Sequence, residues 1–315
     1  MKVGRQKTLR DVAALSGVGV HSGLPVTLML HPADAGTGIV FLRTGLEGGR
    51  EREVRAEVEA VTATEFATVL GDASGPLVST AEHVLAALRG LGVDNAVVEI
   101  DGPEVPILDG SAAPVVEAID QAGIKTLDAP SQYIRVLKPV RVAKGDAFGE
   151  IRPYPRGFRV EAEIQFDHSL IGRQTFALEC RPDTFRQEVA RARTFGFMRD
   201  VAKLWSAGYA LGASLENTVV VTDNRVLNPE GLRFPDEFIR HKVMDAIGDL
   251  ALAGAPLLAA YRSLRGGHKL NCAVVSALLA DRSAWELVEA EPQRPFRGHA
   301  ENAIGLPTAA YAPDV

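Results

Sequence analysis

One helical segment, residues 238–249, constrains the fold more than any other part of the chain, because its two faces differ in chemistry. His241 and Asp245 stand four residues apart, so on a helix they lie one above the other on the same face, and Asp249 continues the row. The opposite face carries apolar side chains, namely Ile239, Val243, Ala246, Ile247 and Leu250. The segment therefore predicts a helix with one face in a hydrophobic core and an imidazole–carboxylate row on the other.

An imidazole and a carboxylate one helical turn apart have two explanations. They can bind one metal ion together, since both are common ligands of zinc and iron. They can also be a pair on a solvated helix face, which is the more common explanation for such a pair taken alone. The spacing alone leaves both open.

The length and charge of the chain limit the class of protein. A chain of 315 residues predicts two domains, because a single hydrophobic core rarely grows to that size. The net charge of −6 argues against a nucleic-acid-binding protein, which normally presents a basic face. A local basic patch near the helix at 238–249 stays possible.

The two cysteines, Cys180 and Cys272, are far apart and form no CxxC motif, so we expect no disulfide framework. The first ten residues lack the apolar stretch of a signal peptide, and no apolar run reaches the ~18 residues of a membrane span. These features together predict a soluble, cytoplasmic protein with no membrane-spanning segment.

The first half of the chain predicts a two-layer α+β domain. Residues 8–72 are mostly strand-like, with clear strands at 25–31 and 38–43. A helix is expected at 80–91, with Ser79 or Thr80 as its N-cap. The remaining elements are a strand at 95–100, a turn-rich loop at 101–110 and a helix at 111–122.

The second half repeats the same element order without a visible sequence repeat. Turn-forming residues at 127–132 place the domain boundary there, giving domains at 1–128 and 133–290 and a Pro-, Ala- and Gly-rich tail at 291–315 with no assigned fold. Strands are expected at 134–142, 149–153, 158–166, 217–222 and 255–261. Helices are expected at 183–192, 200–207, 235–253 and 270–279.

Residues outside the 238–249 helix could complete a hydrolytic metal site. His83 lies near the start of the first-half helix with Glu82 beside it, and adjacent helical residues point about 100° apart. His83 could thus be a third ligand while Glu82 serves as a base. His268 follows a double glycine that would let it reach into a site. Two histidines and one aspartate leave a fourth zinc position open for water.

Each of these histidines, taken singly, is more often structural, and the sequence alone does not bring residues 82, 241 and 268 together. No Walker loop, HExxH or GxSxG motif is present, and the stretch at 17–23 around His21 lacks dinucleotide-binding spacing. The basic and aromatic run at 191–199 is weak support for nucleic-acid binding in an acidic chain.

Blocks along the whole chain resemble one known family, the zinc-dependent UDP-3-O-acyl-N-acetylglucosamine deacetylases of lipid A biosynthesis. The similar blocks occur in order and cover about residues 6–290. They lie at 16–23, 79–91, 92–95, 103–114, 192–200, 225–228, 231–254 and 267–271. The chain departs from the family pattern at Ala213 and Lys269, where smaller residues are usual.

The resemblance assigns roles to individual residues. It implies that His83, His241 and Asp245 bind zinc and that Glu82 activates the zinc-bound water. It further implies that a protonated His268 donates to the leaving amine. The supporting residues would be Thr194 at the oxyanion, Asp249 behind His268, and Lys242, which would be free to meet the substrate diphosphate.

The resemblance also implies a fold and a substrate. The fold is α+β, with two similar two-layer domains, each a sheet packed on a pair of helices and each carrying a small insert. The active site would lie at the domain junction. The second insert, around 201–219, would line a passage for the acyl chain, with Phe195, Leu204, Leu211 and Leu215 as candidate linings.

The leading hypothesis is therefore hydrolysis of the N-acetyl group of a UDP-linked acylated glucosamine. We expect one Zn²⁺ per chain, although Fe²⁺ suits the same ligands. We expect no nucleic-acid partner and a monomer. Two alternatives stay open: a non-catalytic binding module, and a zinc hydrolase acting on a different amide.

Overall fold

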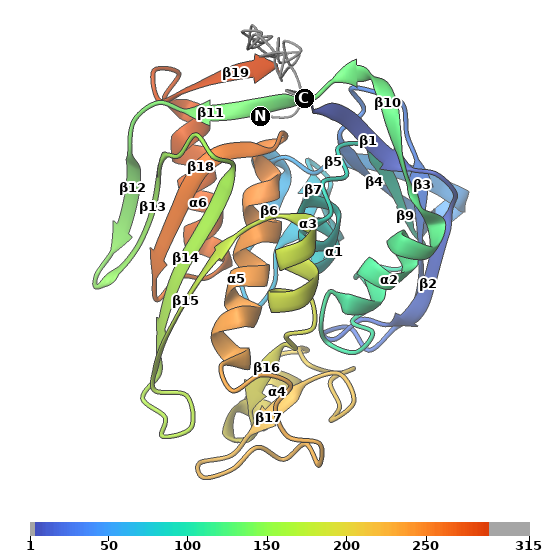
Figure 1. Ribbon diagram of the computed structural model, residues 1–315. Helices are drawn as coiled ribbons and strands as arrows, with labels where there is room; N and C mark the ends of the chain where they lie inside the picture. Colours follow the sequence, from blue (N-terminus) through green and yellow to red (C-terminus); the bar gives the residue numbers. More distant parts are fainter. Residues whose placement is uncertain (1–3, 290–315) are drawn as a thin grey trace, which may run out of the picture.

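The computed structural model describes residues 4–289, in which two large sheets enclose a layer of helices (Figure 1). The tail predicted at 291–315 lies outside the described residues. Each sheet packs on helices from its own half of the chain, and the helices of the two halves meet in the middle. The expected α+β class with paired sheet-and-helix layers is confirmed.

The first half forms a five-stranded sheet with one face on the core. Its strands are β2 (Ala13–Val18), β3 (Pro25–Pro32), β4 (Ile39–Leu46), β5 (Arg50–Arg55) and β9 (Ala96–Ile100). Their order is β2-β3-β9-β4-β5, with β4 and β9 parallel and the other neighbours antiparallel. In β3 the buried residues Val26, Leu28 and Leu30 alternate with more exposed ones, as expected for a sheet covered on one face.

The two helices of this half are α1 (Ala81–Gly90) and α2 (Ala113–Ala122), close to the predicted ranges. Thr80 is the N-cap residue of α1, as predicted, although its side chain makes no capping hydrogen bond. Thr80 precedes the helix in a left-handed conformation with φ of 59° and caps no backbone N–H. Its hydroxyl instead donates to Glu104 Oε1 at 2.9 Å, so tertiary contacts replace the local cap.

The second half forms a seven-stranded sheet centred on one strand. The strands are β11 (Gln132–Val136), β12 (Val140–Lys144), β13 (Ala147–Pro153), β14 (Phe158–Gln165), β15 (Arg173–Glu179), β18 (Leu257–Leu264) and β19 (Trp285–Glu289). Strand β18 pairs antiparallel with β13 and parallel with β14 and β11. Strands β15 and β19 cover two edges, and the sequence patterns did not predict either of them.

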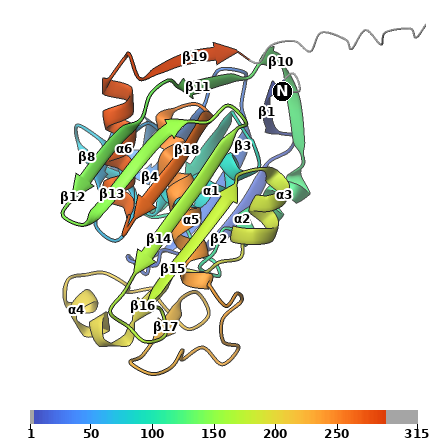
Figure 2. The same ribbon diagram turned by 60° about the vertical axis from the view of Figure 1, so that its left-hand side comes forward.

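Helices α5 (Glu237–Leu250) and α6 (His268–Ala280) pack on this sheet, and a 3-10 turn at Ala251–Ala253 ends α5. The apolar face predicted for α5 is buried. The row of His241, Asp245 and Asp249 is buried as well, so the solvated-face explanation is wrong. Helix α5 lies centrally between the two sheets (Figure 2).

Three smaller pieces and a short helix accompany these two layers. The strands β1 (Arg5–Leu9) and β10 (Ile124–Pro130) pair with each other, as do β6 (Val61–Ala63), β7 (Val69–Asp72) and β8 (Gly75–Val78) in a second small sheet. The third piece is β16 (Phe195–Phe197), α4 (Val201–Ser206) and β17 (Val219–Val221). Because β16 and β17 are parallel, α4 crosses between them, which matches the insert expected around 201–219. A short helix α3 (Pro182–Thr184) continues into a π-turn at Phe185–Val189.

Several predicted boundaries are wrong. The turn-rich stretch at 127–132 is mostly extended, since β10 ends at Pro130 and β11 begins at Gln132. The single strand expected at 134–142 is two strands separated by Pro139, which has no N–H to donate. Because β10 pairs with β1 and β11 joins the large sheet, the chain changes sheets at Ser131. The domain division itself stays a prediction.

Candidate metal centre

Helices α1 and α5 bring three potential metal ligands together. His83 comes from α1, and His241 and Asp245 come from α5, which packs directly on α1. One ligand atom from each residue lies within 4.8 Å of the others. Asp245 Oδ1 is 3.3 Å from His241 Nε2 and 3.8 Å from His83 Nε2. Ligands bound tetrahedrally at about 2.0–2.2 Å from one ion lie roughly 3.3–3.6 Å apart, so these residues fit a single metal ion.

Two further observations support this fit. Asp245 Oδ1 is buried and has no hydrogen-bond partner within residues 4–289, which is costly for a carboxylate unless a cation engages it. His241 Nδ1 lies 3.1 Å from the carbonyl oxygen of Ala192. That contact fixes Nδ1 as a donor and leaves Nε2 as the lone-pair nitrogen facing Asp245 and His83.

The charge states of these three residues also suit a metal. Burial, together with the nearby His241, lowers the pKa of His83 to about 3, so its imidazole is neutral. Burial also lowers the pKa of His241. Burial opposes ionisation of Asp245, but His241 and Lys242 outweigh it and hold the pKa of Asp245 well below its ordinary value. Two neutral imidazoles and one carboxylate are the forms that bind zinc.

Lys242 differs from expectation. Its Nζ lies 2.9 Å from Asp245 Oδ2 and 5.6 Å from the centre of the Phe195 ring, so the ammonium is not free. The prediction considered only the angle between Lys242 and His241 around the helix. Lys242 also stands three residues before Asp245, a spacing at which helical side chains contact each other.

His268 is the first residue of α6 and lies beside the ligands. Its Nδ1 is 2.9 Å from Asp249 Oδ2, which also accepts a hydrogen bond from Asn271 Nδ2 at 2.8 Å. Asn271 Oδ1 in turn accepts from the hydroxyl of Tyr261 at 2.6 Å. Burial alone would lower the pKa of His268, but Asp249 and Glu82 outweigh it and raise that pKa to about 9. His268 is therefore an imidazolium at neutral pH.

Glu82 lies opposite His268, with its Oε1 3.8 Å from His268 Nε2. Its Oε2 accepts a hydrogen bond from the backbone N–H of Thr68 at 3.0 Å. Burial and the neighbouring carboxylates Asp249 and Asp245 raise the pKa of Glu82 to about 7, although His268 opposes them. A carboxylate with this pKa can both take and release a proton near neutral pH.

A pocket of about 260 Å³ opens beside these residues. Thr194, Phe195, Leu204 and Lys242 line it together with Glu82, His268 and the three ligands. Leu211 and Leu215 do not line it and are 54% and 42% exposed. Their assignment as linings of the acyl passage stays a prediction.

Thr194 is held in place by backbone contacts on both sides. Its N–H donates to the carbonyl of Gly110 at 2.8 Å, and its carbonyl accepts from Val219 in β17 at 2.8 Å. The preceding residue, Arg193, is buried and donates through Nε to Glu237 Oε1 at 2.9 Å. This ion pair ties the Thr194 segment to the first turn of α5.

Some residues near the site were not found from the sequence. Thr68 donates through Oγ1 to Asp249 Oδ1 at 2.6 Å, and nothing in its local pattern marks it. Asn271 lies three residues after His268, so a helix predicted to begin at His268 would have placed both on one face. Phe66 and Tyr209 cluster with His21 at the pocket, with Tyr209 and His21 ring centres 5.5 Å apart.

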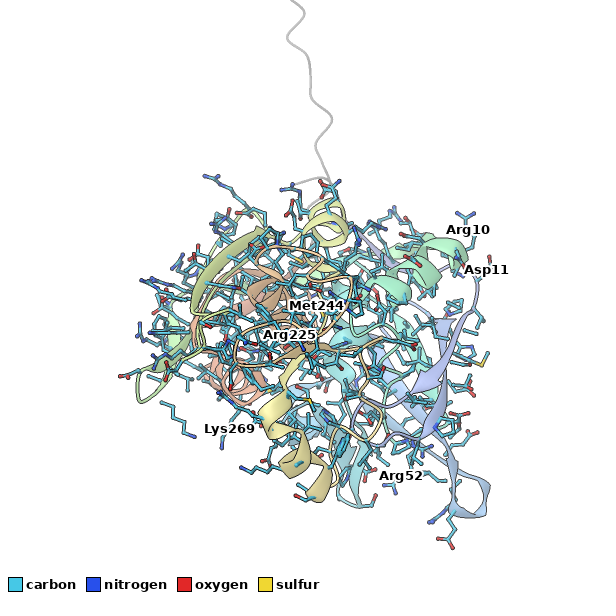
Figure 3. The ribbon with its side chains drawn as sticks, turned by 90° about the horizontal axis from the view of Figure 1, so that it is seen from below. Arg10, Asp11, Arg52, Arg225, Met244 and Lys269 are labelled. Atoms are coloured by element: carbon cyan, nitrogen blue, oxygen red, sulfur yellow. The ribbon has the colours of Figure 1, made fainter. Side chains whose placement is uncertain are left out.

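Two residues that are sequence neighbours of site residues, Met244 and Lys269, lie in different surroundings. Met244, one residue before Asp245, is buried and lies near the middle of the view from below (Figure 3). Lys269, one residue after His268, is exposed and lies at the edge of that view. The departure of Lys269 from the family pattern therefore falls on the surface.

None of the helices within residues 4–289 is both long and apolar enough to cross a membrane.

Comparison with known proteins agrees with the geometry. The family model described as UDP-3-O-acyl N-acetylglycosamine deacetylase matches residues 6–280. The curated UDP-3-O-acyl-N-acetylglucosamine deacetylases of Brucella ovis and Brucella canis are each 53% identical over 286 residues, covering 90% of this chain and 99% of theirs. The protein of the same name from Brucella melitensis biotype 2 is 52% identical over the same length.

Proposed function

The chain belongs to the UDP-3-O-acyl N-acetylglycosamine deacetylase family, and from this premise we propose that it hydrolyses the N-acetyl group of UDP-3-O-acyl-N-acetylglucosamine. The products are acetate and the free amine, in an early committed step of lipid A biosynthesis. The observation that carries the proposal is Asp245 Oδ1, which is buried without a hydrogen-bond partner among residues 4–289 and faces His83 and His241 beside the Glu82–His268 pair.

The family is metal-dependent, and the residues proposed to hold one ion per chain are His83, His241 and Asp245. Zinc is the proposed ion, and Fe²⁺ suits the same donors. Such an ion, when bound, supplies Lewis acidity that lowers the pKa of water and polarises an amide carbonyl.

The chain's own residues then divide the proton transfers. Glu82, with a pKa of about 7, is the proposed base that takes a proton from the attacking water. His268, cationic because Asp249 and Glu82 hold its pKa near 9, is the proposed acid that donates to the departing nitrogen. Asp249 fixes the His268 ring through Nδ1 and leaves Nε2 facing the pocket. The Thr194 hydroxyl is the proposed donor to the oxygen that gains charge.

The substrate would occupy the pocket between the insert and α1. Phe195 and Leu204 are the proposed contacts of the acyl chain, because both line the pocket. Leu211 and Leu215, which are more exposed, stay proposed linings of the acyl passage. Lys242 is the proposed contact of the diphosphate, which would have to compete with Asp245 for its ammonium.

We also infer a cytoplasmic location and a monomer. Both cysteines are free thiols, Cys272 buried and Cys180 half-buried, which suits a reducing compartment. The monomer stays a prediction from the sequence.

The direct test is acetate release from UDP-3-O-acyl-N-acetylglucosamine by protein that has been stripped with a chelator and then given one equivalent of zinc. Loss on stripping and recovery with zinc is the expected result. A folded, zinc-loaded protein that releases no acetate would overturn the substrate assignment and favour another acetylated sugar. Zinc loading that restores neither activity nor a stable bound ion would favour the non-catalytic binding module.

A further inference from the structure

A second cavity, of about 290 Å³, lies at the junction of the two halves and shares no lining residue with the metal-site pocket. It lies where α1 and α5 end, toward β11 and β1 at the top of Figure 1, whereas β16, α4 and β17 beside the metal centre lie at the bottom. The end of α1 contributes Arg89 and Gly90, and the end of α5 contributes Ile247 and Leu250.

Arg89 is the unusual residue of this cavity. Its Nε and Nη1 are buried and have no hydrogen-bond partner within residues 4–289, and Arg89 forms no ion pair there. Asp94 also lines the cavity and is the main charge that opposes the effect of burial on the pKa of Arg89, but its Oδ2 accepts from the backbone N–H of Lys7 at 2.8 Å and it makes no hydrogen bond with Arg89. Leaving these two buried nitrogens without a hydrogen-bond partner is costly, because they have lost their hydration and gained no hydrogen bond in exchange.

The other polar groups of the cavity do not neutralise Arg89. Burial raises the pKa of the Cys180 thiol to about 12, and burial also raises the pKa of the Tyr133 hydroxyl. Both groups are therefore uncharged at neutral pH. Arg5 also lines the cavity, and it already has an acidic partner in Asp128. Lys7 also lines the cavity, so its wall carries three basic side chains, Arg5, Lys7 and Arg89, against the carboxylate of Asp94, and positive charge is in excess there.

The remaining wall is apolar and selects the kind of anion. Its apolar side chains come from both halves of the chain, and include Phe158, Pro182, Ile247, Leu250 and Leu257. The planar fork of an arginine matches a carboxylate with two parallel hydrogen bonds. Inorganic phosphate could use the same fork but would leave the apolar wall in contact with water.

We propose that this cavity binds a small organic carboxylate, whose headgroup pairs with Arg89 and whose short apolar chain packs against Phe158 and Pro182, the accessible apolar side chains of the wall. The site is separate from the metal centre. The occupant would contact both α1 and α5, the two helices that carry the candidate metal ligands at other positions along their length. Its binding should therefore stabilise the folded chain.

The test is titration of the full-length protein with octanoate by calorimetry, with octan-1-ol and inorganic phosphate as comparison probes. We expect saturable one-to-one binding of octanoate and affinities for octan-1-ol and phosphate that are weaker by about tenfold or more. Octanoate binding should persist after chelator treatment, because a carboxylate that used the metal centre would require the ion. Equal affinity for octan-1-ol, no binding of octanoate, or binding that depends on zinc would each overturn the proposal.

Variants locate the binding. Arg89→Met removes the charge at similar length and should weaken octanoate binding by about tenfold or more. Arg89→Lys keeps the charge without the fork, should weaken binding less, and serves in its place if Arg89→Met does not fold. Arg5→Gln, on the same cavity wall but with its own acidic partner, is the matched control and should bind as the unmodified protein does. Unchanged affinity in both Arg89 variants would refute the assignment.

Discussion

Three histidines at the metal centre show how surroundings decide what one residue type does. His83 and His241 are buried with few compensating charges, so burial lowers both pKa values and leaves neutral imidazoles. His268 is nearly as buried, but Asp249 and Glu82 raise its pKa to about 9. The same side chain is thus a candidate ligand at two positions and a candidate acid at the third.

The roles of Glu82 and His268 can be separated from metal binding. Neither residue belongs to the ligand set, so Glu82→Gln and His268→Ala should each lower kcat by about 100-fold or more while zinc content stays near one per chain. Acetate release and metal analysis on the same samples provide the measurement. His83→Ala is the control that should lose the metal itself. Near-normal turnover in either of the first two variants would contradict the role assigned to it.

The rate should have a bell-shaped pH dependence. The base Glu82 must be deprotonated, so activity rises as pH passes about 7, and the acid His268 must be protonated, so activity falls as pH passes about 9. In Asp249→Asn the anion that stabilises the imidazolium is lost, so the alkaline limb should move to lower pH by about 1–3 units. Profiles of kcat/KM against pH measure both limbs. If the alkaline limb does not move in this variant, the deprotonation of His268 is not its cause.

At the scale of elements, the contact between α1 and α5 determines whether the ligands meet. The two helices approach so closely that a Cβ at Gly248 would lie 2.0 Å from the carbonyl oxygen of Glu82. Only a residue without a side chain allows this approach. Because His83 is on α1 and His241 and Asp245 are on α5, the spacing of the two helices sets the spacing of the ligands.

Gly248→Ala should therefore force α1 away from α5. We expect a loss of about 1–3 kcal/mol of stability and weaker zinc binding, since the ligand atoms move apart. Chemical denaturation and zinc titration measure the two effects. Gly267→Ala, at a glycine whose added Cβ meets nothing within 4 Å, is the matched control and should leave both unchanged. Unaltered zinc affinity in Gly248→Ala would show that the helix contact does not set the ligand spacing.

Within the insert, the direction of each leucine predicts which one touches substrate. Leu204 in α4 lines the pocket, whereas Leu211 is exposed. Leu204→Ala should raise KM for a long-chain substrate by about tenfold, because it removes apolar contact area, and should have less effect on a short-chain one. Leu211→Ala, at a more exposed position outside this pocket, should raise KM less. Steady-state kinetics with a long-chain and a short-chain substrate measures these changes in KM.

At the scale of the whole molecule, the metal centre joins the two halves of the chain. Because one proposed ligand lies on α1 and two lie on α5, an ion bound there would stabilise the arrangement of both sheet-and-helix layers at once. Binding to the folded state alone adds about 2.7 kcal/mol at a free zinc concentration 100 times Kd. Thermal unfolding should therefore shift upward by roughly 5 °C on zinc addition after stripping. His241→Ala should show no such shift, and an equal shift in that variant would place the ion elsewhere.

Much of the fold and of the site follows from the sequence by itself. The four-residue spacing of His241, Asp245 and Asp249 specifies a polar row on α5, because helix periodicity is a local property. Ordered motif blocks likewise identified the family and the ligand set that the geometry supports. Strand and helix ranges were close wherever the hydrophobic pattern was long and regular, as in β3, α1 and α5.

Only the tertiary structure decided the rest, since it depends on contacts between residues far apart in the chain. The row on α5 is buried because α1 from the other half packs against it, and no local pattern carries that information. The hydrogen bond from Thr68 to Asp249 joins positions separated by 181 residues. The pairing of Lys242, the exposure of Leu211 and the lack of hydrogen-bond partners for two Arg89 nitrogens among residues 4–289 follow from packing in the same way. Local spacing fixes which face a side chain occupies, and the packing of distant segments fixes what that face meets.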